Sequence, residues 1–150
     1  MIDGIKIKRI ASHADGRGYF REILREKNKL LKHFGQASVS LTKPGVIKAF
    51  HWHKKQDDLF YVVSGKALVV LYDKRKNSKT FGKIMPLEMN ENEPKLLFIP
   101  KGVAHGYKVL GNKPLTMLYI MDKQYNSKNP DESRMDYDDP KIGFDWDKYA

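Results

Sequence analysis

The sequence of 150 residues contains no cysteine and no long hydrophobic run. The missing thiols exclude disulfide bonds, thiolate metal ligands and a cysteine nucleophile. The longest uncharged apolar stretches, such as 59–63 and 67–72, are far shorter than the roughly 20 residues of a membrane-spanning helix. The N-terminus lacks the cationic region and apolar run of a secretory signal. We therefore expect a cytoplasmic, single-domain protein with no membrane partner.

Acidic residues are few compared with basic ones, 18 against 28, which gives a formal net charge of +10. Residues 129–150 contain seven of the acids and only three of the bases. The remaining 25 bases and 11 acids give residues 1–128 a net charge of +14. This excess is expected either for a protein that binds an anion, such as a phosphorylated small molecule, or for a lysine-rich solubilising surface. No nucleic-acid-binding motif is present, so we expect no nucleic acid partner.

Short apolar runs separated by turn residues dominate the chain. The runs are 37–41, 46–52, 59–63, 67–72, 96–99 and 116–121, and the turns include Lys43-Pro44-Gly45 and Pro100-Lys101-Gly102. This pattern predicts an all-β sandwich or barrel, with the continuously apolar strands buried on both faces. The single helical candidate is Arg21–Phe34, with Gly35 as its end. We divide the domain into an N-terminal segment of about 1–35, a barrel of about 36–125 and a C-terminal wrap of about 126–150.

Three histidines occupy a specific frame of glycines. His51 and His53 are two residues apart on an expected strand, so their side chains point to the same face. They lie between Gly45 and Gly65, and a later Pro-x-Gly-x-x-His sequence ends at His105. These two segments resemble the signature motifs of the cupin superfamily, a double-stranded β-helix or jelly-roll barrel. The resemblance implies that the three histidines converge in the barrel interior.

A more specific resemblance extends from about residue 13 to 146. Six segments follow one another in the order of the dTDP-4-dehydrorhamnose 3,5-epimerase family, a branch of the cupins that works without a metal. They are Asp15–Glu22, Lys48–His51, Asp73–Gly82, Ile99–Tyr107, Leu118–Tyr125 and Asp139–Trp146. The resemblance implies an epimerase or isomerase that acts on a nucleotide-linked 4-keto-6-deoxy sugar in deoxysugar or polysaccharide biosynthesis, with no cofactor.

The same resemblance assigns roles to individual residues. His51 matches the catalytic base and Tyr125 the tyrosine acid. Arg17 and Glu22 match residues that contact the nucleotide, and the arginine reaches the site of the partner subunit in a homodimer. Four further residues are expected to contact the substrate: Gln36, Lys48, His53 and His105.

The sequence departs from the family pattern around the expected base. Lys48-Ala49 stands where the family has Arg-Gly, and Asp58 stands where the family has a lysine that stabilises the enolate. An aspartate that orients the base in the family's C-terminal Lys-Asp segment has no counterpart here. Two alternatives therefore stay open. One is a metal-binding cupin enzyme that uses His51, His53, His105 and either Asp57 or Asp58. The other is a non-catalytic cupin that binds a sugar nucleotide.

Overall fold

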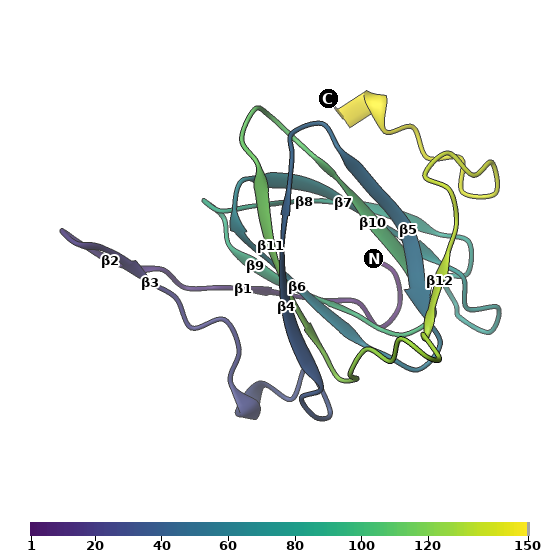
Figure 1. Cartoon of the computed structure of the whole chain (residues 1–150), viewed down its shortest axis with the longest axis horizontal. Helices are drawn as coiled ribbons and strands as arrows, with labels where there is room; N and C mark the ends of the chain where they lie inside the picture. The colour runs from purple at the N-terminus through teal and green to yellow at the C-terminus, as the bar shows by residue number, and fades with distance from the viewer. Residues whose placement is uncertain (150) are drawn as a thin grey trace.

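A computed structural model describes residues 1–149, and almost all of its regular structure is antiparallel β-sheet. The first sheet contains, in spatial order, β1 (Lys6–Arg9), β9 (Lys95–Ile99), β6 (Asp58–Ser64), β11 (Leu115–Met121) and β4 (Gln36–Thr42). The second contains β12 (Glu132–Arg134), β5 (Ile47–His53), β10 (Val103–Val109), β7 (Lys66–Asp73) and β8 (Ile84–Asn90). The two sheets face each other as the walls of a barrel (Figure 1). The prediction of an all-β barrel is confirmed.

The continuously apolar strands are buried on both faces, as the sequence predicted. In β7, Val69 and Leu71 point into the core between the sheets, whereas Leu68 and Val70 pack on the opposite face against Trp146. The core between the sheets is formed by large, fully buried side chains, among them Phe60, Leu97, Tyr107, Leu115 and Met117. The segment after β11 therefore covers the outer face of the second sheet.

The helix predicted over Arg21–Phe34 does not form, and this segment contains only the 3-10 turn η1 (Glu26–Asn28). Its apolar residues Ile23, Leu24, Leu30 and Leu31 pack against the outer face of the first sheet. Lys29 adopts a left-handed conformation with φ of 48°, which ends the helical turn. Tertiary packing of an extended segment has thus overridden a moderate helix propensity.

Besides η1, two further short elements of the described residues lie outside the main sheets. A hairpin of β2 (His13–Asp15) and β3 (Gly18–Phe20), here called the arm, projects away from the barrel (Figure 1). A second 3-10 turn, η2 (Asp147–Tyr149), follows the segment that covers the second sheet. Between residues 1 and 149, no helix has the length and apolar character needed to span a membrane.

Candidate active site

A cavity of about 620 Å³ lies between the two sheets. Both sheets contribute to its wall, because β4, β6 and β11 face β5, β10 and β12 across it. A volume in this range fits a small-molecule site. The residues from the sequence analysis that line the cavity are Gln36, Lys48, His51, His53, Asp58 and Tyr125.

His51, His53 and His105 converge in the barrel interior, as the motifs predicted, with His51 and His53 lining the cavity and His105 buried against His51. His51 and His105 are direct partners on the neighbouring strands β5 and β10, and their ring centroids are 4.2 Å apart. His53 lies two residues further along β5, with its ring centroid 5.8 Å from that of His51. One ring nitrogen from each of the three lies within 4.8 Å of the other two, so the three histidines are close enough to bind one metal ion.

Burial keeps two of these histidines neutral. It lowers the pKa of His51 to about 4, with further lowering by nearby His53 and Arg134. His105 is only 1% exposed, and burial brings its pKa well below the ordinary histidine value. Near neutral pH, His51 therefore has a free lone pair that can accept a proton.

Asp58 is the buried acid of this site, with 3% of its surface exposed. Its Oδ1 accepts a hydrogen bond of 2.7 Å from the Gln56 side-chain amide, and its Oδ2 faces His53 and His105. Burial raises the pKa of Asp58 to about 6, even though His53 and Gln56 act in the opposite direction.

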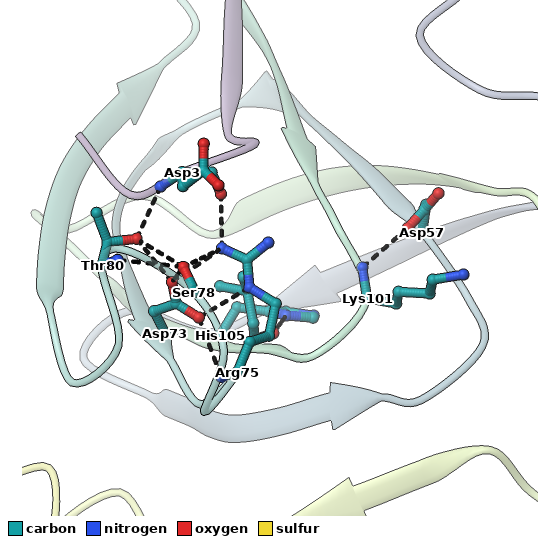
Figure 2. Close-up of polar contacts among 9 residues, drawn as sticks. Asp3, Asp57, Asp73, Arg75, Ser78, Thr80, Lys101 and His105 are labelled. Carbon is teal, nitrogen blue, oxygen red and sulfur yellow. Dashed lines mark hydrogen bonds and ion pairs between the residues drawn. The ribbon is translucent and has the colours of Figure 1, made fainter.

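Asp57, the other acid considered as a metal ligand, points elsewhere. Its Oδ1 accepts a 2.8 Å hydrogen bond from the backbone N–H of Lys101, in the turn before β10 (Figure 2). Its own backbone N–H donates to Asp122. Asp57 therefore joins two loops and does not line the cavity, and Asp58 is the carboxylate that the fold brings to the histidines.

Tyr125, Gln36 and Lys48 lie at the edge of the cavity. The backbone N–H of Tyr125 donates to Gln36 Oε1 at 2.9 Å, and the Gln36 amide donates to Ser38 Oγ at 3.0 Å. This contact holds the loop after β11 beside the start of β4. Tyr125 is 66% exposed and lines the cavity, so it is accessible to a bound molecule.

Arg17 and Glu22 are not part of this cavity. Arg17 lies at the tip of the arm, where it pairs with Asp15 and keeps 91% of its side chain exposed. Glu22 follows the arm and pairs with Arg25. Within this chain, the structure separates these two residues from the histidines.

Several lining residues were missed by the sequence analysis. Glu132 and Arg134 come from β12, a three-residue strand in which they pair with His53 and His51 respectively. Tyr107 and Tyr119 form a hydroxyl chain in the wall, with their oxygens 3.1 Å apart. Burial raises the pKa of Tyr119 above the ordinary tyrosine value. The strand period placed Tyr107 on the same face as His105, but no local signal pointed to β12.

The arrangement combines groups suited to proton transfer on a bound anionic molecule. A neutral imidazole and an exposed phenol border the same space, and Lys48 and Arg134 place positive charge beside it. A base, an acid and cationic support are what a reaction through an enolate requires.

The family model for dTDP-4-dehydrorhamnose 3,5-epimerase matches the chain over residues 1–150. Among curated proteins, the chain is similar to the spore coat polysaccharide biosynthesis protein SpsL of Bacillus subtilis. The two are 56% identical over 146 residues, which cover 97% of each chain.

Solved structures show the same similarity. The dTDP sugar isomerase of Desulfovibrio desulfuricans G20 superposes with a TM-score of 0.90 and 27% identity, over 97% of this chain and 92% of that one. The dTDP-6-deoxy-D-glucose-3,5-epimerase of Legionella pneumophila, in complex with dTDP-4-keto-L-rhamnose, superposes with a TM-score of 0.87 and 29% identity. That match covers 97% of this chain and 80% of the other.

Proposed function

Because the chain belongs to the dTDP-4-dehydrorhamnose 3,5-epimerase family, we propose that it epimerises a nucleotide-linked 4-keto-6-deoxy sugar at the carbons beside the ketone. The chain is accordingly a sugar-nucleotide epimerase or isomerase, and its relative in Bacillus subtilis serves polysaccharide biosynthesis. The expected location is the cytoplasm.

The reaction needs two proton transfers on opposite faces of the sugar ring. The ketone acidifies the neighbouring C–H bond, so the His51 imidazole takes the proton while the C–H electron pair moves onto the ketone oxygen as an enolate. The Tyr125 hydroxyl then delivers a proton to the same carbon from the other face, and the ketone re-forms. His51 loses its proton to solvent and Tyr125 regains one, so substrate and product contain the same atoms. These transfers involve only side chains.

The observation that carries this proposal is the placement of His51 and Tyr125 around one cavity. His51 lies on β5 of the second sheet, and Tyr125 follows β11 of the first sheet. A sugar ring held between the sheets would thus have the base on one side and the phenol on the other. Lys48 at the edge of the cavity supplies a positive charge for the diphosphate.

The arm extends the proposal to a homodimer. A two-stranded hairpin is marginally stable by itself, yet the arm projects from its own barrel with Tyr19 58% exposed and Phe20 64% exposed (Figure 1). We expect these aromatic side chains to pack on a second copy of the chain, where Arg17 and Glu22 would reach the nucleotide. The site would then contain residues of both subunits.

Solvent deuterium exchange into a dTDP-linked 4-keto-6-deoxy hexose tests the base directly. We expect His51→Asn to reduce exchange at the sugar carbons by about 10²–10⁴-fold, the range typical of a lost general base. Binding of dTDP, measured by calorimetry, should change little. His33→Asn is the matched control, because His33 is exposed, does not line the cavity, and has its polar contact with Lys123. Full exchange in His51→Asn would exclude His51 as the base.

Tyr125→Phe separates the two transfers. Proton abstraction by His51 precedes the step that needs the phenol, so this variant should still incorporate deuterium while net epimerisation slows. NMR of the recovered sugar measures deuterium incorporation and net epimerisation in one sample. Loss of exchange and epimerisation to the same extent would contradict the assigned order.

Phe20→Glu tests the assembly, because a charge on the arm would oppose its burial against a second copy. We expect a dimer for the unmodified protein and a shift towards monomer for the variant, measured by light scattering at micromolar concentration. A monomeric unmodified protein would refute the shared site.

A further inference from the structure

Two cationic side chains are available to a reaction that places negative charge on a ketone oxygen. Asp58, at the position of the family's lysine, lines the cavity with 3% of its surface exposed and adds no positive charge. Among the described residues of the cavity wall, Lys48 and Arg134 are the lysine and arginine side chains. The diphosphate and the enolate oxygen each need a cationic partner, and the positions of these two side chains distinguish their roles.

Arg134 is the cross-strand neighbour of the expected base. It pairs with His51 in the antiparallel ladder between β12 and β5, and both residues line the cavity. Residues directly opposite each other in such a ladder have side chains on the same face, with Cβ atoms about 4.5–5.5 Å apart. Burial is the main cause of the lowered pKa of His51, and the Arg134 charge, with that of His53, lowers it further. The guanidinium is therefore close enough to act on the charge of the base.

Lys48 lies further from the base along β5. It comes three residues before His51, which is up to about 10 Å in an extended strand, and it pairs with Tyr107. In a pyranose ring the ketone carbon C4 lies across the ring from C1, which carries the diphosphate. A cation beside the base is thus placed for the ketone, and the more distant cation is placed for the diphosphate.

We propose that the Arg134 guanidinium donates hydrogen bonds to the ketone oxygen and stabilises the enolate, in place of the lysine that Asp58 replaces. This role rests on the proposed function, for which it adds a catalytic residue. As His51 takes the proton, the C–H electron pair forms a C=C bond and the C=O pair moves onto the oxygen. Arg134 keeps its own protons throughout, because a guanidinium is not deprotonated in proteins.

Glu132 orients this guanidinium. Its Oε1 accepts a 2.5 Å hydrogen bond from Arg134 Nε, and the two residues lie two positions apart on the same face of β12. A guanidinium has four further N–H groups on its two terminal nitrogens, so donors remain for a substrate oxygen. The Arg134 side chain is 81% exposed, against 28% for Glu132, which leaves the guanidinium accessible to a bound sugar.

Deuterium exchange into a dTDP-linked 4-keto-6-deoxy hexose, at saturating substrate, tests this role. Arg134→Gln should reduce exchange by about 10²–10³-fold, the range found when one donor to a developing oxyanion is removed. Its affinity for dTDP, which has no ketone, should change little. Arg134→Lys keeps the charge and should recover part of the lost exchange. Arg9→Gln is the matched control, because Arg9 is exposed on β1 and does not line the cavity.

Lys48→Gln supplies the opposite comparison. Loss of the cation at the diphosphate should weaken dTDP binding, measured by calorimetry, while exchange at saturating substrate falls much less than in Arg134→Gln. Thermal denaturation establishes that each variant is folded before the rates are compared.

The outcomes separate the role of Arg134 from the reaction itself. Full exchange at saturating substrate in Arg134→Gln would overturn the proposed role. Weaker dTDP binding with intact exchange would assign Arg134 to the diphosphate and would overturn it as well. In either case, loss of exchange in His51→Asn would still support the epimerase proposal. Absence of exchange in the unmodified protein would refute the proposed function and the role of Arg134 together.

Discussion

Two buried aspartates sit in opposite environments in this molecule. Asp73, at the end of β7, is completely buried and is surrounded by donors (Figure 2). Arg75 Nε and Nη2 each donate to it at 2.8 Å, and the hydroxyls of Ser78 and Thr80 donate at 2.6 and 2.7 Å. Asp58 is similarly buried, but its Oδ2 faces two nitrogen acceptors.

The pKa of each carboxyl depends on the groups that surround it. Burial raises the pKa of both carboxyls, but at Asp73 the hydrogen bonds from Arg75, Ser78 and Thr80 outweigh burial and lower it below the ordinary value. At Asp58 burial dominates and the pKa rises. A carboxylate with all its donors stabilises the fold, whereas one that lacks them is suited to a ligand. The same residue type thus has a structural role in one place and a functional role in the other.

The largest expected effect on stability comes from removing the cation beside Asp73. Arg75→Leu leaves a buried carboxylate with only hydroxyl and backbone donors, so the free energy of unfolding should fall by about 3 kcal/mol. Arg17→Leu is a matched control, because Arg17 pairs with Asp15 at the same two-residue spacing on the exposed arm. That change should have little effect on stability, because exposed ion pairs are well solvated. Urea denaturation measures both, and equal losses would contradict the distinction.

Acid should remove the stabilisation that the Asp73 carboxylate gives to the fold. The folded pKa of Asp73 lies below its unfolded value, so its stabilisation is present above about pH 4 and is lost as the pH falls. Asp73→Asn removes this ionisation and should reduce stability by about 2 kcal/mol at pH 7. Urea denaturation at pH 7, 5 and 3 should show the difference between this variant and the unmodified protein shrinking with acidification. A constant difference would show that the Asp73 charge does not stabilise the fold.

The smallest effect is expected at the cavity. Asp58→Asn keeps an oxygen for the Gln56 amide and gains an N–H that can donate to His105 Nε2, which has no hydrogen-bond partner among the described residues. The free energy of unfolding should therefore change by less than about 1 kcal/mol. Thermal and urea denaturation test this. A loss as large as that of Arg75→Leu would make Asp58 a structural residue like Asp73.

The barrel could be predicted from the sequence because its strands are marked by short patterns of neighbouring residues. The alternation of a strand placed His51 and His53 on one face, and the apolar run at Leu59–Val63 indicated burial on both sides. The helix predicted over Arg21–Phe34 was wrong, because its charged and apolar residues suit either a helix or an extended segment that packs on the sheet. Its conformation depends on the outer face of the first sheet, which no local pattern describes.

The cavity was only partly predictable for the same reason. The motif frame located His105 and left Asp57 and Asp58 as alternatives, and the contact between Asp57 and the Lys101 backbone separates them. Glu132 and Arg134 could not be assigned, because their place beside His53 and His51 results from pairing between segments distant in sequence. Residues that depend on such long-range pairing need the folded structure.

The pairing of β12 with β5 also has a consequence for the order of protein synthesis. The barrel strands through β11 are translated before residues 122–134, which follow about 1–3 s later at usual elongation rates. Until then His53 lacks the Asp131 carbonyl that sets its tautomer, and His51 lacks its partner Arg134. A nascent chain halted after β11 would therefore contain the barrel strands without a complete cavity. Ligand binding by ribosome-bound chains should begin only after β12 has emerged.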